Sequence, residues 1–105
     1  MTEPLDAALK ARLRDVLGRN SVTEPVLRRL SEEGAACALI LEGRLARSER
    51  RLRELSADPE SSLAEIAGEM QSIGELRPDL EELRELLDGL AAHARELRAS
   101  WLGAR

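Results

Sequence analysis

The residues with the clearest potential for chemistry are one histidine, one cysteine and several clusters of charged side chains. His93 and Glu96 lie three residues apart, so on a helix they would share one face, a spacing that metal sites in helical bundles use. A metal site needs three or four converging ligands, and the sequence has no second histidine to contribute. We therefore interpret His93 as a surface residue beside Glu96, and we predict no metal site, no cofactor and no catalytic residue.

Carboxylates recur at three-residue spacing in segment 82–88, at Glu82, Glu85 and Asp88. This spacing resembles that of the magnesium-binding helices of all-α nucleotide pyrophosphohydrolases, which carry a second acidic motif on another helix. Glu65 and Glu69 are the nearest substitute for that motif here. The resemblance implies a metal-dependent nucleotide hydrolase, which we keep as the alternative function from the enzyme class. A solvated helix face is the simpler interpretation.

Arginines gather in the second half of the longest helical segment, at Arg44, Arg47, Arg50, Arg51 and Arg53. Arg44, Arg47 and Arg51 share a face at helical spacing, and they are our candidate residues for docking a partner. The stripe would bind phosphates or an acidic partner, whereas the simpler interpretation is a solvated face balanced by nearby acids. A net charge of -4 and the absence of Phe and Tyr argue against nucleic acid. A nucleic-acid-associated factor therefore stays a further alternative.

The element that would position these arginines is segment 26–55, which contains no proline and repeats its apolar residues at alternating three- and four-residue steps. We expect one stripe of this helix to form an interface through Leu27, Leu30, Gly34, Cys37, Leu41 and Leu45. Segment 35–41 is apolar all round, so other helices must cover several of its faces. Within it we expect Cys37 to be a buried thiol, and one turn earlier we expect Gly34 to mark close helix packing.

Prolines and capping residues divide the chain into four predicted helices, at approximately 3–18, 24–56, 59–76 and 79–102. Pro4, Pro25 and Pro59 suit the first turn of a helix, and Asp58 is placed to cap the third one. Pro78 marks either a turn or a kink between the last two. Trp101 continues the leucine stripe of the last helix, so we expect its side chain to be at least partly buried.

The composition, with 43% hydrophobic and 34% charged residues in a chain of 105, is typical of long helices. We predict one all-α domain over residues 1–105, with about four helices around one long central helix, completed by homodimerisation. The two long helices would cross antiparallel near Ile40, with Glu33 close to Arg47 of the other copy. No apolar stretch reaches the ~20 residues that a membrane span requires. We expect a cytoplasmic, non-catalytic interaction or adaptor module that docks a protein partner, as a chaperone or an assembly subunit.

Overall fold

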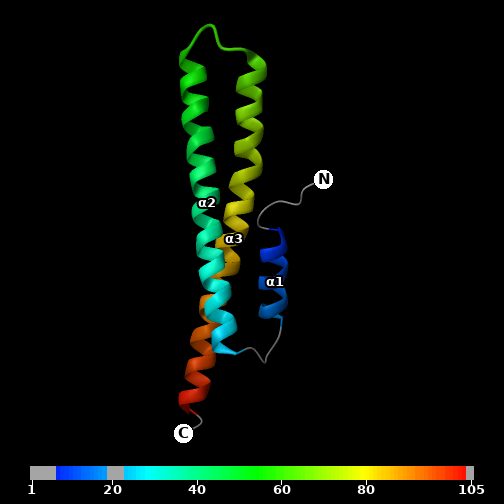
Figure 1. Ribbon diagram of the computed structural model, residues 1–105, viewed down its shortest axis with the longest axis vertical. Coiled ribbons are helices and arrows are strands. Elements are labelled where there is room, and N and C mark those ends of the chain that lie inside the picture. Colours follow the sequence, from blue (N-terminus) through cyan, green and yellow to red (C-terminus); the bar gives the residue numbers. More distant parts are fainter. Residues whose placement is uncertain (1–6, 19–22, 104–105) are drawn as a thin grey trace.

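The computed structural model describes residues 7–18 and 23–103 of the chain, and in these ranges it is all-helical. Helix α1 spans Ala7–Leu17, α2 spans Glu24–Ala57 and α3 spans Leu63–Gly103. Figure 1 shows α2 and α3 as a long antiparallel hairpin, with α1 lying beside the part of the hairpin that is remote from the α2–α3 connection. The described molecule is therefore a rod, with principal extents of 69 × 27 × 16 Å.

Helix α2 agrees with its predicted bounds to within one residue. Thr23 precedes it in extended geometry, and Pro25 occupies its first turn, where a missing N–H leaves no internal hydrogen bond unmade. The backbone leaves the helix after Ala57, where the N–H of Asp58 donates to the carbonyl of Leu55 at 3.2 Å. The 34 residues between these ends form one uninterrupted helix, as the proline-free leucine pattern predicts.

The start of the next helix lies four residues later than predicted. Asp58 accepts a hydrogen bond from the N–H of Glu60 at 2.9 Å, which makes a turn instead of a helix cap. The cap is Ser62, whose Oγ accepts from the N–H of Glu65 at 3.1 Å. The helix predicted at Pro59 therefore begins at Leu63, because the hydroxyl of Ser62 satisfies one of the free N–H groups of the first turn.

The predicted division between 59–76 and 79–102 is wrong, because α3 runs without interruption through Pro78. Proline lacks the N–H that would bond to the carbonyl four residues earlier, which here belongs to Gly74. The structure accommodates this loss within a single helix of 41 residues. The described chain accordingly has three helices where four were predicted. The first of the four was expected at 3–18, and its residues 3–6 lie outside the described range.

The core runs along the seam of the hairpin and under α1. Leu13 of α1 and Leu83 and Leu90 of α3 are its most completely buried large side chains. The leucine stripe of α2 supplies the opposite wall. Because the core contains no aromatic ring, aliphatic packing alone must hold the rod together.

Trp101 corrects a prediction, because its side chain is 62% exposed. The cause lies in the lengths of the two long helices. Arg98 of α3 lies opposite the first residue of α2, with its Nη2 3.5 Å from Oε1 of Glu24. The last turn of α3 therefore extends beyond the start of α2. Trp101 continues the leucine stripe of α3, but it lies in this last turn, where α2 no longer covers the stripe.

Candidate docking surfaces

The stripe predicted as an interface forms the inner wall of a single chain. Leu27, Leu30, Gly34, Cys37 and Leu41 are buried, and Leu45 packs against the same core. Cys37 is a buried thiol, which confirms that part of the prediction. These side chains face α1 and α3 of their own chain, so the stripe is not a free surface for a second copy.

Gly34 is a point of close contact between α2 and α3, as its place on the stripe predicts. A Cβ added at this position would overlap the side chain of Leu87 on α3. Gly43 differs, because a Cβ there would meet nothing within 4 Å. An exposed glycine inside a helix lowers stability by about 1 kcal/mol relative to alanine. At Gly43 no contact within the described chain requires a glycine.

The side of α2 that faces away from α3 carries a continuous apolar patch, which we call the outer face. Leu39 and Ile40 are 68% and 46% exposed, respectively. The patch consists of Ala36, Leu39, Ile40, Gly43 and Ala46, which recur at helical spacing on one side of the helix. Segment 35–41 is thus covered on its inner side only.

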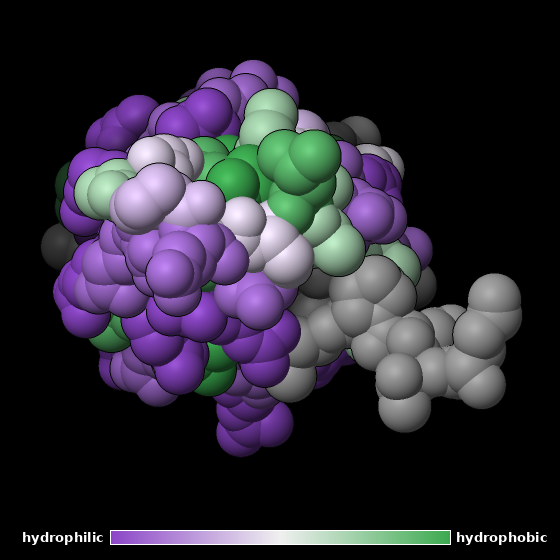
Figure 2. All heavy atoms as spheres, turned by 90° about the horizontal axis from the view of Figure 1, so that it is seen from above, coloured by the Kyte–Doolittle hydropathy of each residue, from purple (hydrophilic) through white to green (hydrophobic). Residues whose placement is uncertain are grey.

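Exposed apolar side chains also mark the two ends of the rod. At the connection end, Leu63 is 83% exposed, and the end-on view in Figure 2 shows a hydrophobic group flanked by hydrophilic side chains. At the other end, Leu27, Leu97 and Trp101 line an apolar groove of about 490 Å³. We call this the end groove. Its lining side chains come from the start of α2 and the last turns of α3.

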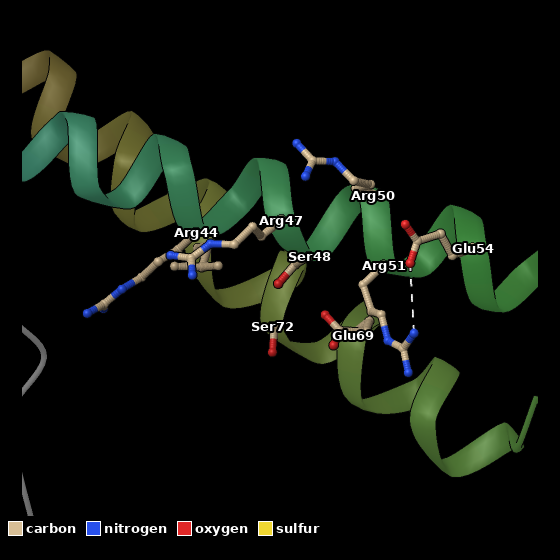
Figure 3. A pocket seen from close by; sticks show the side chains of 9 residues that line it. Arg44, Arg47, Ser48, Arg50, Arg51, Glu54, Glu69 and Ser72 are labelled. Atoms are coloured by element: carbon tan, nitrogen blue, oxygen red, sulfur yellow. Dashed lines mark ion pairs between the residues drawn. The ribbon is translucent and has the colours of Figure 1, made fainter.

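The three predicted docking arginines, Arg44, Arg47 and Arg51, line one open groove between α2 and α3, of about 700 Å³. We call it the basic groove. Figure 3 shows that Arg50 and Glu54 of α2 and Glu69 and Ser72 of α3 also border it. Its remaining lining side chains are Ser48 and Leu76. The fold thus brings the sequence-predicted stripe together with residues of α3 that sequence spacing alone could not assign to it.

The arginines of this groove differ in their partners. Arg51 lies 3.8 Å from Glu54 and 3.5 Å from Glu65 of α3, measured between guanidinium nitrogen and carboxylate oxygen. Arg44, Arg47 and Arg50 form no ion pair with any residue in the described part of the chain. Acids of α3 therefore neutralise only one of the groove's four arginines.

Other arginines tie the helices together elsewhere. Arg84 donates to Glu42 at 2.8 Å and Arg77 to Glu49 at 3.4 Å, both across the hairpin. These pairs are about half exposed, so each contributes on the order of 0.2 to 1 kcal/mol. They fix the register of the hairpin more than they stabilise it. The unpaired arginines of the basic groove have no such structural role.

The acidic residues considered for an enzyme do not converge. Because α3 is continuous, Glu69 and Glu82 lie on one helix, and the thirteen residues between them correspond to about 20 Å along its axis. Within residues 7–18 and 23–103, no group of three His, Cys, Asp or Glu side chains is placed to hold a metal ion. His93 is half-buried, and its Nε2 has no hydrogen-bond partner in the described chain. The predicted surface position beside Glu96 is therefore wrong for this imidazole.

Within the described ranges, none of the helices combines the length and the hydrophobicity that crossing a bilayer requires. No protein-family model, curated protein or solved structure matches the chain.

Proposed function

We propose that the protein is a non-catalytic helical interaction module, which self-associates through the outer face of α2 and docks a protein partner. The observation that carries the proposal is the exposure of Leu39 and Ile40 at the middle of the outer face of α2. Isolated surface leucines are ordinary, but an apolar patch continuous with an open glycine is typical of a helix–helix contact. A second copy is the occupant that the charges flanking this patch fit.

An antiparallel crossing at the level of Leu41, one residue beyond the centre at Ile40 that the sequence predicts, makes the outer face complementary to itself. Residues equidistant from the centre meet in such a pair, because a two-fold axis relates the copies. Leu39 of one copy then lies over Gly43 of the other, where the missing Cβ leaves room. The same crossing sets Glu32 against Arg50, and neither forms an ion pair within the described chain.

The pairing of Glu33 with Arg47 expected from the sequence is less favourable than that of Glu32 with Arg50. Glu33 already accepts a hydrogen bond from Arg12 of α1 at 2.6 Å, so in a dimer it would serve two arginines. Each exposed pair across the crossing is worth about 0.2 to 1 kcal/mol. Apolar burial therefore supplies the affinity, and the charges select the antiparallel direction.

Light scattering tests self-association directly. We expect a mass that approaches twice 11.6 kDa as concentration rises, and a monomer for Leu39→Glu, which places a charge in the apolar contact. Leu63→Glu is the matched control, because it changes an even more exposed leucine at the connection end and should leave the dimer intact. A mass of 11.6 kDa at every concentration refutes the dimer.

The antiparallel direction has its own test. Glu32→Arg and Arg50→Glu should each weaken the dimer, and the double exchange should restore it, since the same two side chains then meet with their charges reversed. If the double variant loses as much dimer affinity as the two single variants together, the antiparallel crossing is refuted, but the dimer itself is not.

The alternative of a metal-dependent nucleotide hydrolase has less support, because its candidate carboxylates are spread along one helix. A thermal shift assay with Mg²⁺ or Mn²⁺ separates the two proposals, since a ligand that binds only the folded state raises the melting temperature. The interaction module is expected to show no specific stabilisation by either ion.

A further inference from the structure

We propose that the basic groove binds an acidic helix of a partner protein, which lies along the hairpin in line with α1. This inference rests on the proposed docking role and names the chemistry of the partner. Apart from Arg50, which borders both surfaces, it concerns a different surface from the outer face of α2, so self-association and partner docking can fail separately.

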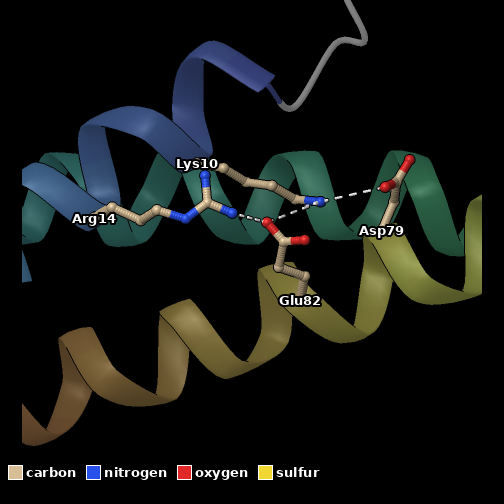
Figure 4. A network of polar contacts seen from close by, with 4 residues as sticks. All are labelled: Lys10, Arg14, Asp79 and Glu82. Atoms are coloured by element: carbon tan, nitrogen blue, oxygen red, sulfur yellow. Dashed lines mark hydrogen bonds and ion pairs between the residues drawn. The ribbon is translucent and has the colours of Figure 1, made fainter.

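Helix α1 shows how a third helix is held on this hairpin. Leu9, Leu13 and Val16 are buried on its inner side. Figure 4 shows Lys10 and Arg14 directed toward acids of α3. The Lys10 Nζ lies 3.6 Å from Asp79 and 3.9 Å from Glu82, and Arg14 bonds to the same Glu82.

The α2 side of α1 is bordered in the same way, because Arg12 of α1 donates to Glu33 of α2. A helix that carries three cations thus lies against a hairpin whose edges carry three acids along this stretch. The charges of the third helix and of the hairpin edges are complementary wherever α1 is present.

The basic groove lies beside the part of the hairpin against which α1 packs, on the side toward the α2–α3 connection. On α2, Arg44, Arg47 and Arg51 follow Glu33 by 11, 14 and 18 residues, which are close to whole numbers of helical turns. All four residues therefore lie on one side of α2. On α3, the groove begins at Leu76, one turn before the Asp79 that binds Lys10. No described helix covers the hairpin beyond this point (Figure 1).

The charge of the hairpin edge reverses where α1 ends. Next to α1, the residue of α2 at the edge is Glu33, and further along it is Arg44, Arg47 or Arg51. A helix that continues the line of α1 therefore needs carboxylates on its α2 side, where α1 carries Arg12. The arginines are spaced by three and four residues, so carboxylates at the same steps on a parallel or antiparallel helix lie opposite them.

The dimensions of the groove also favour a helix. Its α2 side runs from Arg44 to Glu54, which is about 15 Å or nearly three helical turns. Ser48 and Ser72 are half-buried in its wall, and such small side chains permit close approach of another helix. Leu76 offers an apolar contact at the end of the groove that is nearest to α1.

Nucleic acid fits this groove less well. Glu54 and Glu69 lie in its wall, and they would repel a phosphate backbone that passes along it. Among Phe, Tyr and Trp the chain has only Trp101, which lies in the last turn of α3, far along that helix from the groove, so the groove offers no such ring for base stacking. In a partner helix, by contrast, a single basic or hydroxyl side chain facing Glu69 resolves the repulsion.

The test uses the full-length protein and a fluorescently labelled helical peptide of about five turns, with glutamates at three- and four-residue steps on one side. We expect salt-sensitive binding by fluorescence anisotropy. Arg47→Glu should weaken binding about tenfold, because it reverses a charge at the centre of the groove. Arg95→Glu is the matched control: it makes the same exchange at an exposed arginine of α3 outside the groove, and it should leave the affinity within about twofold of the wild type.

A second peptide, with lysines in place of the glutamates, completes the design. It should bind Arg47→Glu better than the wild type. Equal binding of the acidic and basic peptides by the wild type, or equal losses in Arg47→Glu and Arg95→Glu, overturns the assignment. A single-stranded RNA oligonucleotide that displaces the acidic peptide at lower concentration than unlabelled peptide overturns it in favour of nucleic acid.

The result for self-association is separate. A monomer by light scattering that binds the acidic peptide refutes the proposed dimer and supports the groove assignment. A dimer that binds neither peptide overturns the groove assignment alone.

Discussion

At the scale of single residues, Gly34 permits a close contact between the two long helices. The side chain of Leu87 occupies the space that a Cβ at this position would need. Leu30 and Leu41, on the same stripe, are buried in the same core. The glycine thus allows one leucine of α3 to pack directly on the backbone of α2, in a core that has no aromatic ring to fill space.

We predict that Gly34→Ala lowers the free energy of unfolding, because the new methyl group overpacks the contact with Leu87 at a cost of about 1 to 3 kcal/mol. The gain in helix propensity, about 1 kcal/mol, offsets only part of this cost. Gly68→Ala is the matched control, since a Cβ there meets nothing within 4 Å, and it should stabilise the protein. Urea titrations of both variants provide the measurement. A stabilised Gly34→Ala variant would show that Leu87 can move aside freely.

At the scale of elements, α3 depends on how a helix passes through Pro78. The proline leaves the carbonyl of Gly74 without its usual donor, and its ring crowds the same carbonyl. Both residues are exposed, so water can bond to the freed carbonyl, and a glycine at the crowded position allows the backbone to adjust. The buried aliphatic residues on either side, Ile73 and Leu80, stay on the inner face and keep the helix on the hairpin.

We predict that Pro78→Ala stabilises the protein by roughly 1 to 3 kcal/mol, because it restores one hydrogen bond inside α3 and removes the ring's steric conflict. Pro25→Ala is the control, as that proline lies in the first turn of α2, where no such bond is lost, and the change should be close to neutral. Thermal unfolding followed by circular dichroism compares the two. A lower melting temperature for Pro78→Ala would mean that the fold requires a bend at this proline.

The sequence predicted individual helix faces better than helix ends. The three- and four-residue steps of leucine correctly identified the buried side of α2, and the spacing of the arginines correctly placed Arg44, Arg47 and Arg51 on one surface. Periodicity does not reveal which helix covers a face or where that helix stops. This is why the stripe assigned to an interface packs within the chain, and why Trp101, in register but beyond the start of α2, is exposed.

The misplaced boundaries have a related cause. Pro59 and Pro78 carry the same local signal, since each disfavours helical geometry in the residue before it. Pro59 lies in the turn between antiparallel helices, whereas the hairpin packing around Ile73 and Leu80 holds α3 together across Pro78. Tertiary contacts therefore decide between a turn and a continuous helix. Glu69, Ser72 and Leu76 joined the basic groove for the same reason, because only the fold sets α3 beside the arginines of α2.

At the scale of the whole molecule, the rod is far from the shape of a compact domain. Its radius of gyration is 18.5 Å, against about 13 Å for a globular chain of roughly this length. A rod of two or three helices has much surface for its volume, so apolar side chains remain exposed along its side at Leu39 and at its ends at Leu63 and Trp101. Each of these places offers a different way for two copies to meet.

Small-angle X-ray scattering of the dimer distinguishes these arrangements. We predict a side-by-side dimer through the outer face of α2, with helix axes about 10 Å apart at the crossing, so its radius of gyration should exceed 18.5 Å by only a few ångströms. An end-to-end dimer through the end groove at Trp101 or through Leu63 would join two 69 Å rods and roughly double that radius. Trp101→Ala should therefore leave both the mass and the radius of the dimer unchanged. A doubled radius, or a monomer in Trp101→Ala, would move the contact from the middle of α2 to the end of the rod.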